Sequence, residues 1–152
     1  MSVQCIVDHV SNFDIVDLYA RIDPDEVYVD THGVSVSCVF NSQKAIDLQY
    51  ITVNRIGWFG KRRIVTITDG NPPEIGYFFT EGNFTRRLAI SGNITAKYVK
   101  IYFQSVTCLD EGHYECKAGG IDDKGLFRYF TDSNSMVIRC KYIFRSIVDK
   151  TR

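Results

Sequence analysis

The chain has 152 residues and is balanced in charge, with 18 Lys and Arg side chains against 18 Asp and Glu. A chain of this length is most simply one domain that buries a hydrophobic core, and the balanced charge gives no indication of nucleic acid or an anionic membrane as a partner. No run of about 18 apolar residues predicts a membrane span, and the N-terminus lacks the basic and apolar regions of a signal peptide. With nine Tyr, ten Phe and only three Pro, the composition favours strands over helices.

The first clear alternation of apolar and polar residues begins at Val27. It predicts a short edge strand at 27–29, a turn at 30–33 and a half-buried strand at 34–38. The segment before it, residues 1–22, is expected to form an arm packed on the domain or an added edge strand.

Gly and Pro residues then separate further short alternating segments, and none of these segments has a sustained helical period. Eight or more short strands, with turn residues every 8–14 positions, predict an antiparallel sandwich or barrel. The further strands are expected at 46–50, 62–68, 86–90, 99–103, 112–118 and 135–144.

Five cysteines are many for a cytosolic chain of this size and favour disulfides formed in an oxidising compartment. None forms a Cys-x-x-Cys pair, and the three His are scattered, so the sequence predicts no zinc site or other metal site. Two Asn-x-Thr tripeptides, at Asn83 and Asn93, are typical of secreted chains and are candidates for glycosylation. The cysteines are Cys5, Cys38, Cys108, Cys116 and Cys140.

The most distinctive motif is Asp-x-Gly-x-Tyr-x-Cys, at 110–116, in which the four named side chains share one face of an extended segment. Four apolar residues precede Asp110 by 11, 9, 7 and 4 positions, and the segment 27–38 places a Gly turn and a Cys 78 residues before Cys116. This arrangement resembles the variable-type (V-set) domain of the immunoglobulin superfamily, over about residues 24–143. The four apolar residues are Val99, Ile101, Phe103 and Val106.

The resemblance implies an all-β, immunoglobulin-like (V-set) antiparallel two-sheet Greek-key sandwich with an N-terminal extension. The domain is expected at 23–146, after the arm or extra edge strand of 1–22 and before a C-terminal tail at 147–152.

The resemblance also assigns roles to individual residues. Cys38 and Cys116 are expected to join the two sheets through the core, and Tyr114 to form a tyrosine corner with its hydroxyl bonded to nearby backbone. Gly112 would allow a close approach that a Cβ obstructs, and Asp110 would meet Arg87, or its neighbour Arg86, at one end of the sandwich.

The position of Trp58 departs from the family, because it follows Cys38 by 20 residues where about a dozen is usual. In one alignment residues 56–62 form the third strand, with Trp58 packed on the disulfide. In the slightly favoured alternative, 45–53 is that strand and Tyr50 or Leu48 takes the core position. Trp58 and Phe59 then form a hairpin tip and are candidate contacts with a partner, although a core Trp is equally compatible with the sequence.

After Cys116 the chain lacks the Phe-Gly-x-Gly motif of antibody and T-cell-receptor joining segments. A long loop is expected at about 118–134, and its aromatic and Arg residues have the composition of contact patches. Whether these side chains contact a partner or pack inward stays open at this stage. They are Leu126, Phe127, Arg128, Tyr129 and Phe130, of which Phe127, Arg128 and Tyr129 are the candidate partner-binding residues.

Three cysteines remain once Cys38 and Cys116 are paired. One further disulfide is expected among Cys5, Cys108 and Cys140, with a weak preference for Cys5–Cys140, which would join the N-terminal arm to the last strand.

No nucleophile with a partnered base, no paired carboxylates and no phosphate-binding loop are evident, so we expect neither an enzyme nor a bound cofactor. The resemblance implies an extracellular recognition module of a cell-surface receptor. Its partner would be a protein, another immunoglobulin-type domain or a second copy of itself, for cell adhesion or self/non-self recognition, with membrane attachment only through an anchor outside this fragment. A secreted or virally encoded decoy that binds a host protein, and a structural module of an extracellular stalk, are the alternatives.

Overall fold

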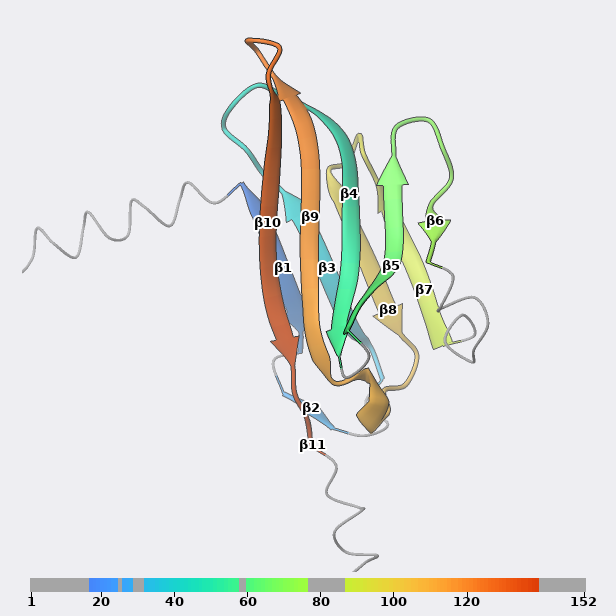
Figure 1. Cartoon of the computed structure of the whole chain (residues 1–152). Coiled ribbons are helices and arrows are strands. Elements are labelled where there is room, and N and C mark those ends of the chain that lie inside the picture. The colour runs from blue at the N-terminus through green and yellow to red at the C-terminus, as the bar shows by residue number, and fades with distance from the viewer. Residues whose placement is uncertain (1–16, 25, 29–31, 58–59, 77–86, 140–152) are drawn as a thin grey trace, which may run out of the picture.

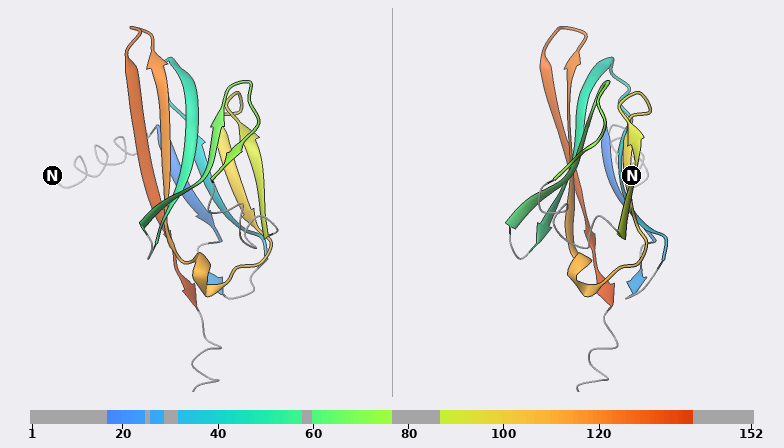
Figure 2. Two further views of the ribbon diagram at one scale, coloured as in Figure 1. Left: turned by 45° about the vertical axis from the view of Figure 1, so that its right-hand side comes forward. Right: turned by 90° about the vertical axis from the view of Figure 1, so that its right-hand side faces the viewer.

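The computed structural model describes residues 17–24, 26–28, 32–57, 60–76 and 87–139. Over these residues the chain forms two antiparallel sheets that pack face to face (Figures 1 and 2). The expected all-β two-sheet sandwich is therefore confirmed.

The sheet at the rear of Figure 1, here called the back sheet, contains four of the described strands in the order β1-β3-β8-β7. All of its neighbouring strands are antiparallel. The strands are β1 (Leu18–Asp23), β3 (Val34–Phe40), β8 (Tyr98–Phe103) and β7 (Leu88–Asn93).

The sheet nearer the viewer, here called the front sheet, contains five of the described strands in the order β10-β9-β4-β5-β6. A short parallel pair, β2 with β11, and the 3-10 turn η1 lie at the lower end of the sandwich (Figure 1). The bounds are β4 (Ile46–Gly57), β5 (Gly60–Thr68), β6 (Glu74–Ile75), β9 (Gly112–Asp122), β10 (Phe127–Met136), β2 (Val27–Tyr28), β11 (Ile138–Arg139) and η1 (Cys108–Asp110).

Alternation with period two explains which faces of the sheets meet. In β8 the side chains of Val99, Ile101 and Phe103 are buried, while the residues between them face outward. The strands of the front sheet supply the opposite wall of the same core. Its most deeply buried apolar side chains include Val34, Val36, Ile51, Val53, Val65, Val99, Ile101, Phe103, Val106 and Tyr114.

Two alternatives were given for the strand that follows the one at 34–38. The alternative that begins at residue 45 is correct, because that strand is β4. β4 ends at Gly57 and β5 begins at Gly60. Trp58 and Phe59, the candidate hairpin tip, lie outside the described residues.

The expectation that Tyr50 or Leu48 takes the core position beside the disulfide is wrong. Val53 is the β4 residue opposite Cys116. The pairing of β4 with β9 is irregular between Leu48 and Tyr50, where β4 contains one extra residue. The alternation of inward and outward side chains therefore shifts at this point. As a result Leu48 is buried elsewhere in the core, and Tyr50 lies half-buried on the outer face.

The long loop expected at 118–134 is also wrong, because β9 continues to Asp122 and β10 begins at Phe127. The Asp122 carboxylate accepts hydrogen bonds from the backbone N–H groups of Lys124 and Leu126, at 2.9 Å each, and so holds a tight turn. Gly125 in this turn has a φ of +79°, which glycine adopts without strain. Most of the supposed loop is therefore a long hairpin.

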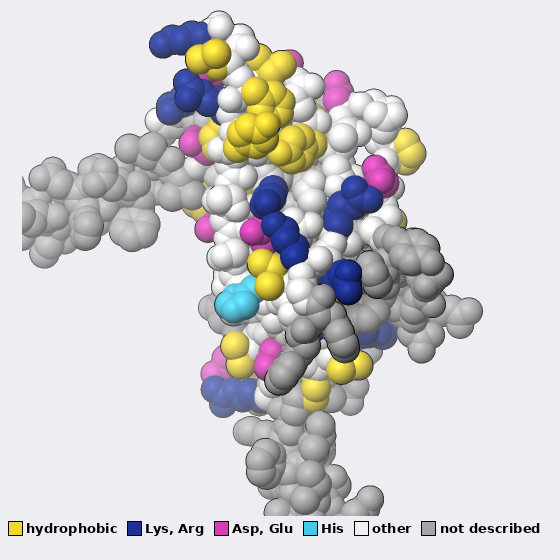
Figure 3. Space-filling model, viewed as in Figure 1, with side chains coloured by type: hydrophobic (Ala, Val, Ile, Leu, Met, Phe, Trp, Pro, Cys, Tyr) yellow, Lys and Arg dark blue, Asp and Glu magenta, His cyan; other side chains and the backbone are white. Residues whose placement is uncertain are grey.

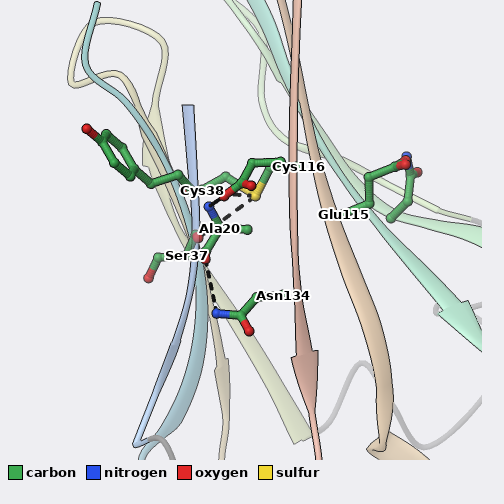
Figure 4. Close-up of a disulfide and its surroundings, with 9 residues drawn as sticks. Ala20, Ser37, Cys38, Glu115, Cys116 and Asn134 are labelled. Atoms are coloured by element: carbon green, nitrogen blue, oxygen red, sulfur yellow. Dashed lines mark hydrogen bonds between the residues drawn. A yellow bond between two sulfur atoms is a disulfide. The ribbon is translucent and has the colours of Figure 1, made fainter. Parts of the chain in front are cut away.

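Part of the segment expected as an arm or an added edge strand, residues 1–22, forms the edge strand β1, which pairs with β3. Its free edge is bound by side chains of β10, because Asp132 accepts a hydrogen bond from the Ala20 N–H at 2.7 Å and the Asn134 amide donates to the Ala20 carbonyl at 3.2 Å (Figure 4). These bonds satisfy backbone groups that an edge strand otherwise presents to another chain. Residues 1–16 and 140–152, with the expected tail, lie outside the described residues.

Candidate functional site

A disulfide joins the two sheets through the middle of the core. It links Cys38 of β3 to Cys116 of β9, whose Cα atoms are 5.7 Å apart (Figure 4). Both cysteines are fully buried. The pairing implied by the family resemblance is confirmed.

The tyrosine corner stands beside this disulfide at the lower end of β9. The Tyr114 hydroxyl donates a hydrogen bond to the Asp110 carbonyl at 2.5 Å, and its ring packs edge-on against Phe103, with ring centroids 6.2 Å apart. Burial raises the pKa of the Tyr114 hydroxyl, because the apolar surroundings disfavour a phenolate. The residue thus pins η1 to the start of β9.

Asp110 is the most deeply buried charged residue among those described, at 0% exposure, and its carboxylate is bonded on two sides. Arg87 donates to both of its oxygens, at 2.9 and 3.2 Å, and the Thr107 N–H donates at 2.8 Å. The hydrogen bond to Asp110 raises the pKa of the Arg87 guanidinium, so Arg87 stays charged. This bidentate pair closes the lower end of the sandwich.

Arg55 is a structural residue that sequence reasoning missed. Its guanidinium donates to the carbonyl oxygens of Leu109 and Glu111, the second at 2.9 Å, and so fastens β4 to the turn around η1. Gly112 lies beneath this contact, where an added Cβ would come within 3.0 Å of the Ile56 carbonyl oxygen. An Arg in the middle of a strand pattern predicts only a solvated side chain, so the sequence gives no indication of this role.

The second disulfide involves Cys108, which is disulfide-bonded. Because Cys38 and Cys116 are bonded to each other, a disulfide at Cys108 contradicts the expected pairing of Cys5 with Cys140. Both lie outside the described residues.

The outer face of the front sheet carries an exposed group of aromatic side chains, here called the front aromatic cluster, made of Tyr50, Phe127 and Tyr129. The rings of Phe127 and Tyr129 are 4.8 Å apart between centroids. Tyr50 and Phe127 cover Gly119, since a Cβ added there would lie 2.4 Å from the first ring and 2.8 Å from the second. Figure 3 shows apolar side chains gathered near the upper end of this face.

The cluster projects into solvent at one side. Tyr129 is 77% exposed and Phe127 43% exposed, and the neighbouring Leu126 and Ile121 are exposed as well. Burial of Tyr50 raises the pKa of its hydroxyl, and the nearby Tyr129 raises it further. Phe127 and Tyr129 were predicted as contact residues, whereas Tyr50 and Gly119 were not.

Two other aromatic or charged candidates on this hairpin have different environments. The Arg128 guanidinium is paired with the Asp122 carboxylate at 2.9 Å, so its charge is already balanced within the hairpin. Phe130 points the opposite way from the cluster and packs edge-on against Phe40, with ring centroids 5.0 Å apart.

A charged group lies below the front aromatic cluster on the same face. Glu115 is bonded to Lys61 at 2.6 Å and lies 3.8 Å from Lys117, and the Asn54 amide donates to it at 3.2 Å. The bonds from Lys61 and Asn54 and the charge of Lys117 outweigh the desolvation of Glu115 and lower its pKa. The pKa of Lys117 is also lowered, first by the neighbouring Lys61. The carboxylate of Glu115 is thus shared by two ammonium groups.

Of the two glycosylation candidates, Asn93 is exposed at the end of β7, and Asn83 lies outside the described residues. Within the described part of the chain, no three His, Cys, Asp or Glu side chains are grouped to hold a metal ion. No helix among the described residues is long and apolar enough to cross a membrane.

The order of strands identifies the type of sandwich. An immunoglobulin domain has strands A, B, E and D in one sheet, and the variable type adds strands C′ and C″ to the sheet of G, F and C. Here β1-β3-β8-β7 match the first sheet, and β10-β9-β4-β5-β6 match the second, with both added strands. The fold is that of a V-set immunoglobulin domain.

Comparison with known proteins agrees with this fold. A solved structure of murine CRIg superposes on the V-set domain with a TM-score of 0.61, covering 80% of this chain and 98% of that one at 13% sequence identity. No protein-family profile matches the sequence, and no curated protein matches it. A likeness at this identity is one of fold alone. The buried disulfide between Cys38 and Cys116 is typical of proteins that fold in an oxidising compartment.

Proposed function

We propose that this V-set domain is the extracellular recognition module of a cell-surface receptor, and that it binds a protein partner through the upper end of its front sheet. The observation that carries the proposal is the front aromatic cluster, which exposes Tyr129 and Phe127 side by side on the hairpin of β9 and β10.

Exposed aromatic rings of this kind supply much of the binding free energy in protein interfaces, because they bury a large area at a low cost in side-chain entropy. Gly119 supports this arrangement: its missing side chain lets the Tyr50 and Phe127 rings lie close to the backbone of β9. The cluster is therefore held in place before a partner arrives, which lowers the entropic cost of binding.

The charge next to the cluster indicates what the partner presents there. Lys61 and Lys117 share the single carboxylate of Glu115, so this group of three side chains has a net charge of one positive unit. A partner surface with an apolar centre and an Asp or Glu at its rim complements both features.

A second copy of the domain is the other candidate partner. The chain has no net charge, so two copies do not repel each other at long range, and the front face carries side chains of both signs. A face that meets itself about a two-fold axis forms a closed interface.

The proposal is tested with beads that carry many copies of the domain. These beads are incubated with a panel of cells and, to detect self-association, with a second set of beads that carry the same domain. Tyr129→Ala is compared with Tyr102→Ala, which removes a tyrosine of 39% exposure from the outer face of the back sheet. We expect Tyr129→Ala to weaken binding at least about tenfold, in the range of an interface hot spot, and Tyr102→Ala to leave it unchanged. Thermal melting curves of both variants serve as the folding control.

Equal losses in the two variants would show that the contact is not confined to the front sheet. Absence of binding to every cell type, together with a strict monomer in sedimentation at high concentration, would favour the structural-stalk alternative instead.

A further inference from the structure

We infer that Asn93 carries an N-linked oligosaccharide that lies over the outer face of the back sheet and covers its tyrosines. The inference rests on the proposed extracellular location but not on the identity of any partner.

The side chain of Asn93, to which the sugar would be attached, lies at the surface of the domain. Asn93 is the last residue of β7, and Asn93 and Thr95 are both exposed, while Ile94 between them is buried and anchors the turn. The Asn93 Oδ1 accepts a hydrogen bond from the Ala96 N–H at 2.7 Å. This bond uses the oxygen of the amide, so it leaves the nitrogen Nδ2 as the atom for attachment.

The chemistry of attachment needs only a donor of the secretory pathway. The Asn93 Nδ2 loses one proton and forms a bond to the anomeric carbon of the first sugar, while the bond from that carbon to a lipid-linked diphosphate breaks and the diphosphate leaves with the proton. Such sugars are bulky and are tolerated only at the surface.

The sheet register places this site at the head of an apolar row. Asn93 lies opposite Tyr98, Tyr98 opposite Val39, and Val39 opposite Tyr19, across all the described strands of the back sheet. All four residues point outward, since their neighbours along each strand are the core residues. The row is thus a continuous strip of partly exposed rings and one aliphatic side chain that leads away from the attachment point.

The adjoining row has the complementary chemistry for sugar hydroxyls. It contains Ser91, Lys100, Ser37 and Arg21 in register, next to the row of Asn93. Pyranose rings have an apolar face, which packs on aromatic rings, and hydroxyls at their edges, which bind polar side chains. An oligosaccharide on Asn93 therefore fits along the tyrosine row with its hydroxyls toward the second row.

The consequence is a division of labour between the two outer faces. The back sheet carries tyrosines that would otherwise form an exposed apolar surface, and the sugar covers them. The front aromatic cluster lies on the other sheet and stays free.

The first measurement is site occupancy. The chain is secreted from mammalian cells, and its peptides are analysed by mass spectrometry before and after enzymatic release of N-linked sugars. Asn93→Gln and Thr95→Ala are both expected to remove the same oligosaccharide, and Asn83→Gln is the matched control that leaves it in place. A secreted chain with an unmodified Asn93 would overturn the inference.

The second measurement is coverage, by hydroxyl-radical footprinting of the glycosylated chain and of Asn93→Gln. Loss of the sugar is expected to increase oxidation of Tyr19 and Tyr98 at least about twofold, because a bulky surface sugar shields what it covers, and to leave Tyr129 unchanged. Occupied Asn93 with identical oxidation of Tyr19 and Tyr98 in both forms would overturn the coverage. Neither readout involves a partner, so failure of the proposed function leaves this test intact.

Discussion

The two sheets of this domain are built alike on the inside and differently on the outside. Both bury every second residue against a common core, and Figure 2 shows the two layers facing each other along their length. On the outer face of the front sheet, Tyr129 and Phe127 touch each other and project from a hairpin. On the back sheet, the exposed Tyr102 lies under the Lys100 ammonium, 4.5 Å from its ring centroid. The inner faces explain stability, and the difference between the outer faces is the reason for proposing the front sheet as the recognition surface.

The largest effect is expected from the bond that holds the two sheets together. Replacement of Cys38 and Cys116 by Ala removes a link between residues 78 apart in the sequence. The chain-entropy account gives a loss of roughly 4–5 kcal/mol in the free energy of unfolding for a loop of this size. Urea denaturation of the double variant against the parent measures it. A loss below about 1 kcal/mol would mean that packing alone joins the sheets.

The next largest effect compares a buried with an exposed ion pair. Asp110→Ala leaves Arg87 without its carboxylate, and breaking a buried pair is expected to cost about 3 kcal/mol, reduced somewhat because Arg87 is partly exposed. Glu74→Ala breaks the exposed pair with Arg63 and is expected to cost less than about 0.5 kcal/mol. Denaturant midpoints of the two variants check the difference, and equal losses would contradict the account.

A smaller effect tests how the front aromatic cluster is seated. Gly119→Ala adds a methyl group where the Tyr50 ring now lies, so the ring must move, at a cost of about 1–2 kcal/mol. The near-ultraviolet circular dichroism of the tyrosines is expected to change, and binding to cells to fall. Ser37→Ala, on the outer face of the back sheet, is the control and should leave both readouts as they are. An unchanged spectrum for Gly119→Ala would show that the rings are not packed on the strand.

The smallest effect concerns the tyrosine corner and depends on pH. Tyr114→Phe removes one buried hydrogen bond and is expected to cost about 1 kcal/mol near neutrality. Because burial raises the pKa of Tyr114 above that of an ordinary tyrosine, the folded state keeps its proton when the unfolded chain loses it.

Its contribution to stability is therefore complete below about pH 10, the unfolded pKa of tyrosine, and decreases as the pH rises further. Tyr114→Phe should make the loss of stability above that pH less steep. Denaturation curves at neutral and alkaline pH measure this, and parallel pH profiles for the two proteins would contradict it.

Disulfide mapping of the unaltered protein tests which cysteine is bonded to Cys108 at the lower end of the sandwich. The strand β11 packs against η1, which carries Cys108, and Cys140 is the residue that follows β11. We expect non-reducing digestion to yield the peptide of Cys108 joined to that of Cys140. A peptide that joins Cys108 to Cys5 would show that the N-terminal arm is fastened there instead.

The motif from Asp110 to Cys116 could be predicted from the sequence because one of its contacts is local and another has a spacing that is common in the family. The hydroxyl of Tyr114 bonds to a carbonyl four residues away. The partner of Cys116 lies on a distant strand, but the spacing between the two cysteines is common in the family. Period-two alternation needs no knowledge of distant neighbours, so most buried positions were also predictable.

The candidate site was only half predictable because it depends on register. Phe127 and Tyr129 were identifiable by composition, but Tyr50 joins them only through the irregularity in β4, which turns its side chain outward. Gly119 and Gly120 indicated a loop in the sequence, whereas in the fold each lies under neighbouring side chains where a Cβ has no space. A single sequence shows glycines but not what packs over them.

One experiment tests the central claim, that the front sheet binds the partner, more directly than any deletion of a contact. Thr131→Asn creates a glycosylation tripeptide with Ser133, two residues from Tyr129 on the same face of β10. Binding of this variant to cells is measured when it carries the new sugar and again after enzymatic removal of the sugar. The account predicts that binding is lost with the sugar in place and returns when it is removed, while Asn93→Gln binds as the parent does. Unchanged binding by the fully glycosylated variant would contradict it.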